Sequence, residues 1–269
     1  MTANTLFMPV ERHGFGSLIS GANDILALTW RNLLGYKRVP QLLVFSTIQP
    51  VIFVIMFRYV FGGAIAVPGF SYVDFLMPGV FAQTVTFGAT TTAIGLAGDL
   101  NTGLLERFRS LPMSRSAVLA GRTTADLTRN VFVVLLMAAV GFAVGFRIHG
   151  SVLEFVAGLA LILLFGYTFS WVFATVGLWV RDPEAAQAAS FPVLAPLVFA
   201  SSAFVPTATM PGWLRVFADH QPVSVTASAV RDLMLGLPAT NDVLQSLGWC
   251  IGILAVFVPL AIWRYQRTA

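Results

Sequence analysis

A short stretch of charged and apolar residues, Leu104–Pro112, lies between long apolar runs. If it is helical, its apolar side chains share one face and its polar side chains the other, because residues at i, i+4 and i+7 align. The apolar face holds Leu104, Phe108 and Leu111, and the opposite face holds Glu106, Arg109 and Ser110. Pro112 ends the helix because it lacks a backbone N–H. The pattern predicts a two-faced helix at a membrane surface that offers its charges to a partner.

The sequence shows no catalytic or metal-binding arrangement. Lys37 is the only lysine, and the glycine pattern of a P-loop does not precede it. The single cysteine, Cys250, excludes a disulfide framework and a cysteine metal site. The three histidines, His13, His149 and His220, fall outside the apolar runs, which argues against a zinc site. We therefore expect a chain that is not an enzyme and binds no cofactor of its own.

The composition is that of an integral membrane protein. Of 269 residues, 57% are hydrophobic and 10% are charged, whereas soluble domains carry about 25% charged residues. Because roughly 20 apolar residues cross a bilayer, the chain has room for about six spans. The first apolar run begins too far into the chain for a cleavable signal peptide. We expect an all-α membrane protein with a cytosolic tail over 1–20 and one transmembrane domain over 21–269, with spans near 42–61, 75–98, 126–146, 152–179, 188–206 and 244–263.

The distribution of charge predicts the orientation. With both termini inside, most of the 16 basic residues fall on the inner side, and the positive-inside rule makes that side cytoplasmic. The helix Leu104–Pro112 then lies in the cytosol. Residues 23–40 combine Trp30 and Tyr36 with basic residues, which predicts an interfacial helix before the first span. On the outer side, Thr207–Thr240 predicts two short re-entrant helices split at Gln221–Pro222, with an ordinary outer loop as the alternative.

Polar residues within the predicted spans indicate where a substrate could pass. All 12 acidic residues fall outside the predicted apolar centres, so the chain has no evident ion coupling and any uphill work needs a partner. Hydroxyl and amide groups in lipid need hydrogen-bond partners, so they either join helices or line a path for an amphipathic substrate. The candidates are Gln49, Gln83, Thr84, Thr86, Thr90, Ser201 and Ser202, with Phe191, Phe199 and Phe204 as an apolar gate or as ordinary packing.

Three groups of residues, in this order, resemble the membrane subunits of type-2 ABC exporters, and most closely the daunorubicin-resistance group. They are Leu105–Arg115, then Arg181–Gln187 with the span that runs to Pro206, and then Met210–Leu214 with Gln221–Pro222 and Val230–Gly236. The resemblance covers nearly the whole chain. It departs from the family pattern at Gln221, where asparagine precedes the proline more often.

The resemblance implies a complex in a bacterial cell membrane. Two permeases, identical or paralogous, would pair above two cytosolic ATP-binding subunits, which hold ATP and Mg. The family's coupling helix corresponds to Leu104–Pro112: Glu106, Arg107 and Arg109 would enter a groove of the ATPase, and the apolar face would pack on the permease. Arg181 and Asp182 form either a second, smaller contact or a capped turn.

The mostly apolar path with scattered hydroxyls favours export of an amphipathic drug or a lipid-like molecule. Membrane lipid is then a partner of the chain, and nucleic acid is not. Three alternatives stay open at this point. The first is a permease that exports a glycan or lipid-linked polysaccharide. The second is a channel or secondary transporter that works without an ATPase, and the third is a membrane scaffold or sensor.

Overall fold

The computed structural model describes residues 25–34, 40–65, 67, 69–103 and 115–267, and these contain helices and no strand. The all-α class expected from the sequence is confirmed. A helix over 25–34 comes first. It is followed by α2 (Pro40–Met56), the π-helix η1 (Phe57–Phe61), α3 (Tyr72–Gly88), α4 (Thr90–Asn101), α6 (Arg115–Val144), α7 (Val152–Val180), α8 (Pro183–Phe199), the 3₁₀ turn η2 (Thr207–Thr209), α9 (Gly212–His220), α10 (Pro222–Leu235) and α11 (Thr240–Arg267).

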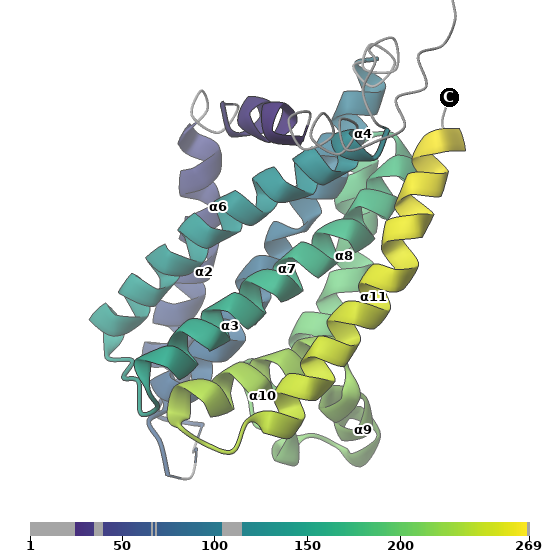
Figure 1. Ribbon diagram of the computed structural model, residues 1–269. Helices are drawn as coiled ribbons and strands as arrows, with labels where there is room; N and C mark the ends of the chain where they lie inside the picture. Colours follow the sequence, from purple (N-terminus) through teal and green to yellow (C-terminus); the bar gives the residue numbers. More distant parts are fainter. Residues whose placement is uncertain (1–24, 35–39, 66, 68, 104–114, 268–269) are drawn as a thin grey trace, which may run out of the picture.

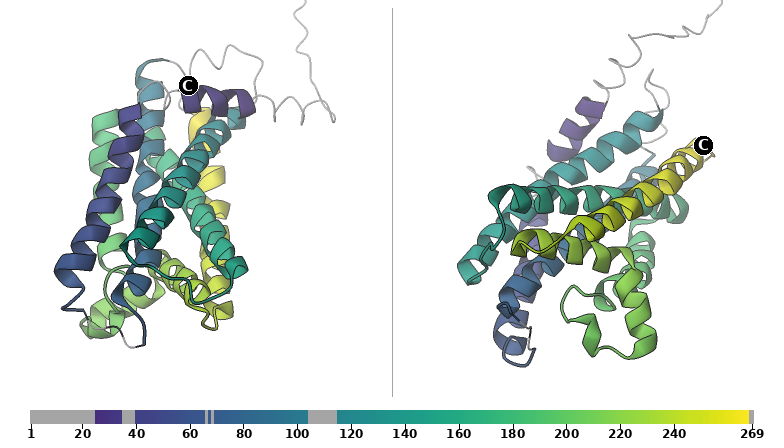
Figure 2. Two further views of the ribbon diagram at one scale, coloured as in Figure 1. Left: turned by 90° about the vertical axis from the view of Figure 1, so that its left-hand side faces the viewer. Right: turned by 60° about the horizontal axis from the view of Figure 1, so that its bottom comes forward.

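The long helices form one bundle with two different ends (Figure 1). The helix over 25–34 lies across the end at which α11 finishes, and we call this the C-terminal end. Helices α9 and α10 lie at the opposite end, which we call the α10 end, and the two further views agree (Figure 2). Helix α7 contacts α4, α6, α10 and α11, so it is the centre of the bundle.

Four helical stretches of the described residues are long and apolar enough to cross a membrane. They are Tyr72–Asn101, Ala117–Val144, Val152–Val180 and Thr240–Arg267, which correspond to the second, third, fourth and sixth predicted spans. The apolar helix Ser46–Phe61 is shorter, and α8 has 17 residues. These two occupy the places of the first and fifth predicted spans.

Local sequence signals explain where several helices begin and end. Ser151 and Glu154 form a capping box at the start of α7, in which each side chain binds the backbone N–H of the other residue. Pro222 begins α10, and Gly236 ends it at a φ of 71°, which glycine adopts without strain. The two short helices predicted within 207–240 are therefore present as α9 and α10. Helix α10 is mostly buried against α3, α7 and α11.

Small residues allow close contact between helices in the core. A Cβ atom added at Gly177 of α7 would lie 2.4 Å from the backbone oxygen of Ala93 in α4. A larger residue at 177 would therefore push α4 away from α7. This contact matters for the site because α4 carries part of its polar wall.

Helix α6 begins at Arg115, so the amphipathic entry expected from Ser116 and the span expected from Asp126 form one continuous helix. Asp126 therefore lies within the helix and not at its start. Its side chain is buried in the bundle, with an exposed fraction of 0%. This corrects the expectation that every acidic residue lies outside the apolar part of the bundle. The carboxylate is tolerated there because two arginines of the same helix, Arg122 and Arg129, lie beside it.

Candidate transport cavity

A cavity of about 660 Å³ lies between α2, α3, α4, α6 and α8. It begins at Glu184 in the first turn of α8, near the C-terminal end, and reaches Leu194 farther along the same helix. Its lining combines amides (Gln49, Gln83, Asn130, Gln187), hydroxyls (Ser46, Thr84, Thr90, Thr91, Ser190), apolar side chains (Phe87, Val133, Phe191, Leu194) and two charged residues (Arg129, Glu184). A mixed lining of this kind suits a ligand with an apolar body and a few polar groups.

The cavity brings together half of the residues predicted to line a substrate path. They come from four helices and are Gln49, Gln83, Thr84, Thr90 and Phe191. Gln83 is 2% exposed, and its Oε1 has no hydrogen-bond partner among the described residues. Asn130 is also 2% exposed, and its Nδ2 likewise has no hydrogen-bond partner among the described residues. Buried amide groups are normally paired, so such atoms are expected where a ligand or water completes the site.

The other predicted path residues lie elsewhere. Thr86 is buried in α3 and donates its hydroxyl to the carbonyl of Ala82 at 2.6 Å, as threonine often does within a helix. Phe199, Ser201, Ser202 and Phe204 lie at and beyond the end of α8, outside the cavity lining.

Aromatic packing encloses these residues at the α10 end. The ring of Phe204 stacks on Phe57 of η1 with centroids 4.6 Å apart, and it also contacts Phe53 and Phe199. The backbone N–H of Ser202 donates to Ser224 Oγ of α10 at 2.9 Å. The predicted apolar gate residues are therefore divided, with Phe191 in the cavity and the other two in this aromatic group.

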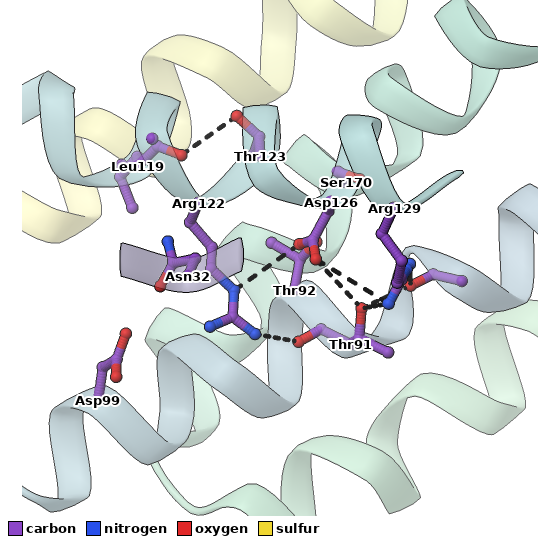
Figure 3. Close-up of polar contacts among 12 residues, drawn as sticks. Asn32, Thr91, Thr92, Asp99, Leu119, Arg122, Thr123, Asp126, Arg129 and Ser170 are labelled. Atoms are coloured by element: carbon purple, nitrogen blue, oxygen red, sulfur yellow. Dashed lines mark hydrogen bonds and ion pairs between the residues drawn. The ribbon is translucent and has the colours of Figure 1, made fainter. Parts of the chain in front are cut away.

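Beside the cavity lies a group of charges that we call the α6 charge cluster, consisting of Arg122, Asp126 and Arg129 (Figure 3). The carboxylate of Asp126 lies 3.7 Å from Arg122 Nε and 4.0 Å from Arg129 Nη1. It also accepts a hydrogen bond from the hydroxyl of Thr92 at 2.5 Å. Of the cluster, Arg129 lines the cavity.

The cluster binds the junction between α3 and α4. Arg129 donates to the carbonyl of Gly88 at 2.7 Å and to the hydroxyl of Thr91. Arg122 donates to the backbone oxygen of Thr91 at 3.0 Å. The junction is the single residue Ala89 between the two helices. Burying a charge is unfavourable unless it is paired and hydrogen-bonded, and these contacts provide both.

Sequence reasoning used Arg122 and Arg129 only for orientation and missed the cluster. A signal was present, because residues 122, 126 and 129 are spaced i, i+4 and i+7 and therefore share one helix face. The pattern alone does not show that this face meets α4, whose Thr91 and Thr92 complete the site.

The predicted coupling residues are only partly described. Leu104, Glu106, Arg107, Phe108, Arg109, Leu111 and Pro112 lie outside the described residues. Arg181 ends α7 with a left-handed φ of 62°, and the carboxylate of Asp182 caps α8 by accepting from the Ala185 N–H at 2.8 Å. The geometry is that of a capped turn, and both residues are exposed. A contact of this turn with an ATPase stays a prediction.

A bundle of apolar helices around a polar cavity is the architecture of a membrane transport protein. The profile of the ABC-2 type transporter family matches residues 23–235. The chain is 37% identical over 238 residues to the daunorubicin resistance ABC transporter permease protein DrrB1 of Streptomyces coeruleorubidus. The aligned region covers 88% of this chain and 84% of the relative. The chain therefore belongs to the ABC-2 type transporter family and is a permease subunit of an ABC exporter.

Two more distant relatives carry related descriptions. The probable doxorubicin resistance ABC transporter permease protein DrrC of Mycobacterium tuberculosis is 29% identical over 226 residues, which are 83% of this chain and 81% of the relative. The inner membrane transport permease YadH of Escherichia coli is 27% identical over 228 residues, which are 82% of this chain and 86% of the relative. The resemblance noted from the motifs is thus confirmed, including the daunorubicin-resistance group.

Proposed function

We propose that the chain moves an amphipathic drug or lipid-like molecule out of a bacterial cell, using ATP that a separate subunit hydrolyses. The observation that carries this proposal is the cavity, whose amides, hydroxyls and aromatic rings suit a molecule that is largely apolar. The names of two relatives, which refer to daunorubicin and doxorubicin resistance, point to the same class of substrate.

The proposed topology has six crossings with both termini in the cytosol. The four long apolar stretches, the shorter helix Ser46–Phe61 and α8 supply the crossings. The C-terminal end of the bundle then faces the cytosol and the α10 end faces outward. The cavity begins near the cytosolic end at Glu184, where a molecule from the cytosol or the inner leaflet would enter.

The proposed partners are two cytosolic ATP-binding subunits, with their ATP and Mg, and a second permease. Leu104–Pro112 connects α4 to α6 and is the proposed contact with the ATPase. Because α4 and α6 both contribute to the cavity wall, a force on this connection would reach the cavity directly. Charged pairs suit such a joint because they fix register as well as attraction.

The test is transport by the permease and its ATP-binding subunit in sealed vesicles, followed by doxorubicin fluorescence. We expect uptake into inside-out vesicles that needs ATP. Glu106→Ala combined with Arg109→Ala should abolish uptake while the protein still inserts. Asp219→Asn, which changes an exposed carboxylate of α9 at the α10 end, serves as a control that should leave uptake unchanged.

Each alternative gives a different outcome. Uptake that needs no ATP would support a channel or secondary transporter. Unchanged doxorubicin accumulation in cells that carry the double variant would support a scaffold or sensor. Failure with doxorubicin together with ATP-dependent movement of a lipid-linked glycan would support the polysaccharide exporter.

A further inference from the structure

Arg129 is a buried cation that also forms part of the cavity wall. It lies midway along α6, and its side chain is 3% exposed. Arginine inside a membrane bundle is unfavourable and is retained mainly where it has a function. A purely structural role would require only that the guanidinium contact other parts of the protein, whereas Arg129 also adjoins the space in which a substrate would lie.

The charges around this wall favour an oxygen anion as ligand. The α6 charge cluster contains two guanidinium groups and one carboxylate, so its formal charge is positive. Asp126 is fully buried and already contacts both arginines as well as Thr92. The other charged residue of the cavity lining is Glu184, which is exposed in the first turn of α8, so water screens its charge. Inside the bundle, where screening is weaker, the positive wall dominates.

The same arginine holds the start of α4 in place. Arg129 donates to the Gly88 carbonyl and the Thr91 hydroxyl, as Figure 3 shows for the Thr91 contact. A guanidinium donates in a fixed plane, so a carboxylate or phosphate that binds it must compete with these two acceptors and with Asn130 Oδ1, which accepts from Arg129 at 3.0 Å. Helix α4 leads into residues 104–114 and α6 follows them, so loosening this contact changes how the two ends of that segment are held.

We propose that a carboxylate or phosphate oxygen of an amphiphilic substrate binds Arg129 in the cavity and draws it away from Gly88 and Thr91, which signals to the ATPase contact that the cavity is occupied. The inference rests on the proposed function and narrows its substrate to the acidic, lipid-like members of that class, because doxorubicin carries an amine and no carboxylate or phosphate. It also names the effect of the head group on coupling. It requires the ligand to bind the loosened arrangement more tightly than the closed one, since only such a difference shifts the population.

The experiment uses the full complex in vesicles and two fluorescent probes with the same alkyl tail, one ending in a carboxylate and the other in an amine. Arg129→Gln is compared with Arg122→Gln, a matched control that removes an arginine from the same cluster but not from the cavity lining. We expect Arg129→Gln to weaken binding of the carboxylate probe about tenfold, as loss of a charge-assisted hydrogen bond does, with little change for the amine probe. Arg122→Gln lowers the charge of the cluster by the same amount but keeps the guanidinium that lines the cavity, so it should reduce the carboxylate preference less than Arg129→Gln does.

Thr91→Val provides a second variant that keeps the arginine and removes one of its acceptors. We expect it to bind the carboxylate probe more tightly and to hydrolyse ATP faster without probe, because Arg129 is released more easily. The inference is overturned if Arg129→Gln weakens both probes equally or neither, if Arg122→Gln reduces the carboxylate preference as much as Arg129→Gln does, or if Thr91→Val leaves binding unchanged. A wild-type complex that shows no ATP-dependent transport contradicts the proposed function instead, whatever the probes show in binding.

Discussion

Two buried arginines, one midway along α6 and one on α10, bind backbone carbonyls, yet their surroundings differ. Arg129 of α6 binds the Gly88 carbonyl, lies beside the carboxylate of Asp126 and lines the cavity. Arg231 of α10 binds the carbonyls of Phe75 and Ser202, at 3.0 Å and 2.7 Å. Its guanidinium also lies 3.8 Å from the centre of the Phe75 ring.

The difference shows what each contact does. Arg231 joins α10 to α3 and to the segment after α8, and its packing against an aromatic ring gives it the character of a permanent structural link. Arg129 is held by groups that a ligand in the cavity can replace. We infer that the α10 end is built to stay closed around α10, while the junction of α3 and α4 is built to change.

The largest effect that tests this comparison is expected for Asp126→Asn. The substitution keeps the shape of the side chain but leaves the buried Arg129 and the largely covered Arg122 without their carboxylate, and breaking a buried ion pair in this way costs about 3–5 kcal/mol. Thermal unfolding of the purified complex in detergent measures it. Adding Arg122→Gln should recover part of the loss, because the surplus charge is removed.

The matched control for Asp126→Asn is Asp99→Asn. Asp99 pairs with Arg31 at 3.5 Å, but the Arg31 side chain is 36% exposed, so this pair should contribute less than about 1 kcal/mol. Equal losses in the two variants would show that the α6 charge cluster contributes no more than a partly exposed ion pair.

A smaller but still clear loss is expected for Arg231→Met. Methionine fills much of the space but leaves the Phe75 and Ser202 carbonyls without their donor, at a cost of about 2–3 kcal/mol. The unfolding temperature should fall, whereas the preference between carboxylate and amine probes should not change. Arg215→Met on α9 is the control, since its pair with Asp219 is exposed on both sides. A changed probe preference in Arg231→Met would remove the distinction between the two arginines.

The sequence predicted the α10 end better than the cavity wall, for a physical reason. Helices α9 and α10 follow from local signals, since Pro222 begins α10 and Gly236 ends it. The division between Gln221 and Pro222 was therefore visible in the chain. The burial of α10 was less visible, because it depends on Arg231 reaching carbonyls of two distant segments.

The cavity wall depends on contacts between distant residues. Hydropathy counts Arg122, Asp126 and Arg129 as polar, which moved the predicted start of the third span to Asp126. The amphipathic entry expected from Ser116 is part of the helix, which begins at Arg115. The mutual pairing of the three charged residues and their contacts with α4 were not visible, because no local pattern reports contacts with a distant helix. The polarity of Gln83 and Thr84 was visible in the chain, but their position opposite α8 was not.

The smallest expected effect is on how stability depends on pH, and it concerns Asp232, the neighbour of Arg231. Burial, together with the hydrogen bond and negative charge of Asp242, raises the pKa of Asp232 to about 7, while Arg231 acts in the opposite direction. The folded state therefore holds this proton more tightly than the unfolded chain, in which the pKa of an aspartate is about 3.9. The stabilisation is present below the unfolded value and is lost as the pH rises through about 7.

We therefore expect Asp232→Asn to change how stability depends on pH. The variant cannot ionise at this position, so its unfolding temperature should gain on that of the wild type from pH 5 upward, and the gain should level off as the pH passes the pKa of about 7. Asp219→Asn is the control, because this exposed carboxylate of α9 pairs with exposed Arg215. A constant difference between wild type and Asp232→Asn across this range would mean that the carboxylate keeps one protonation state. The contribution of Asp232 to stability at the α10 end would then not depend on pH over this range.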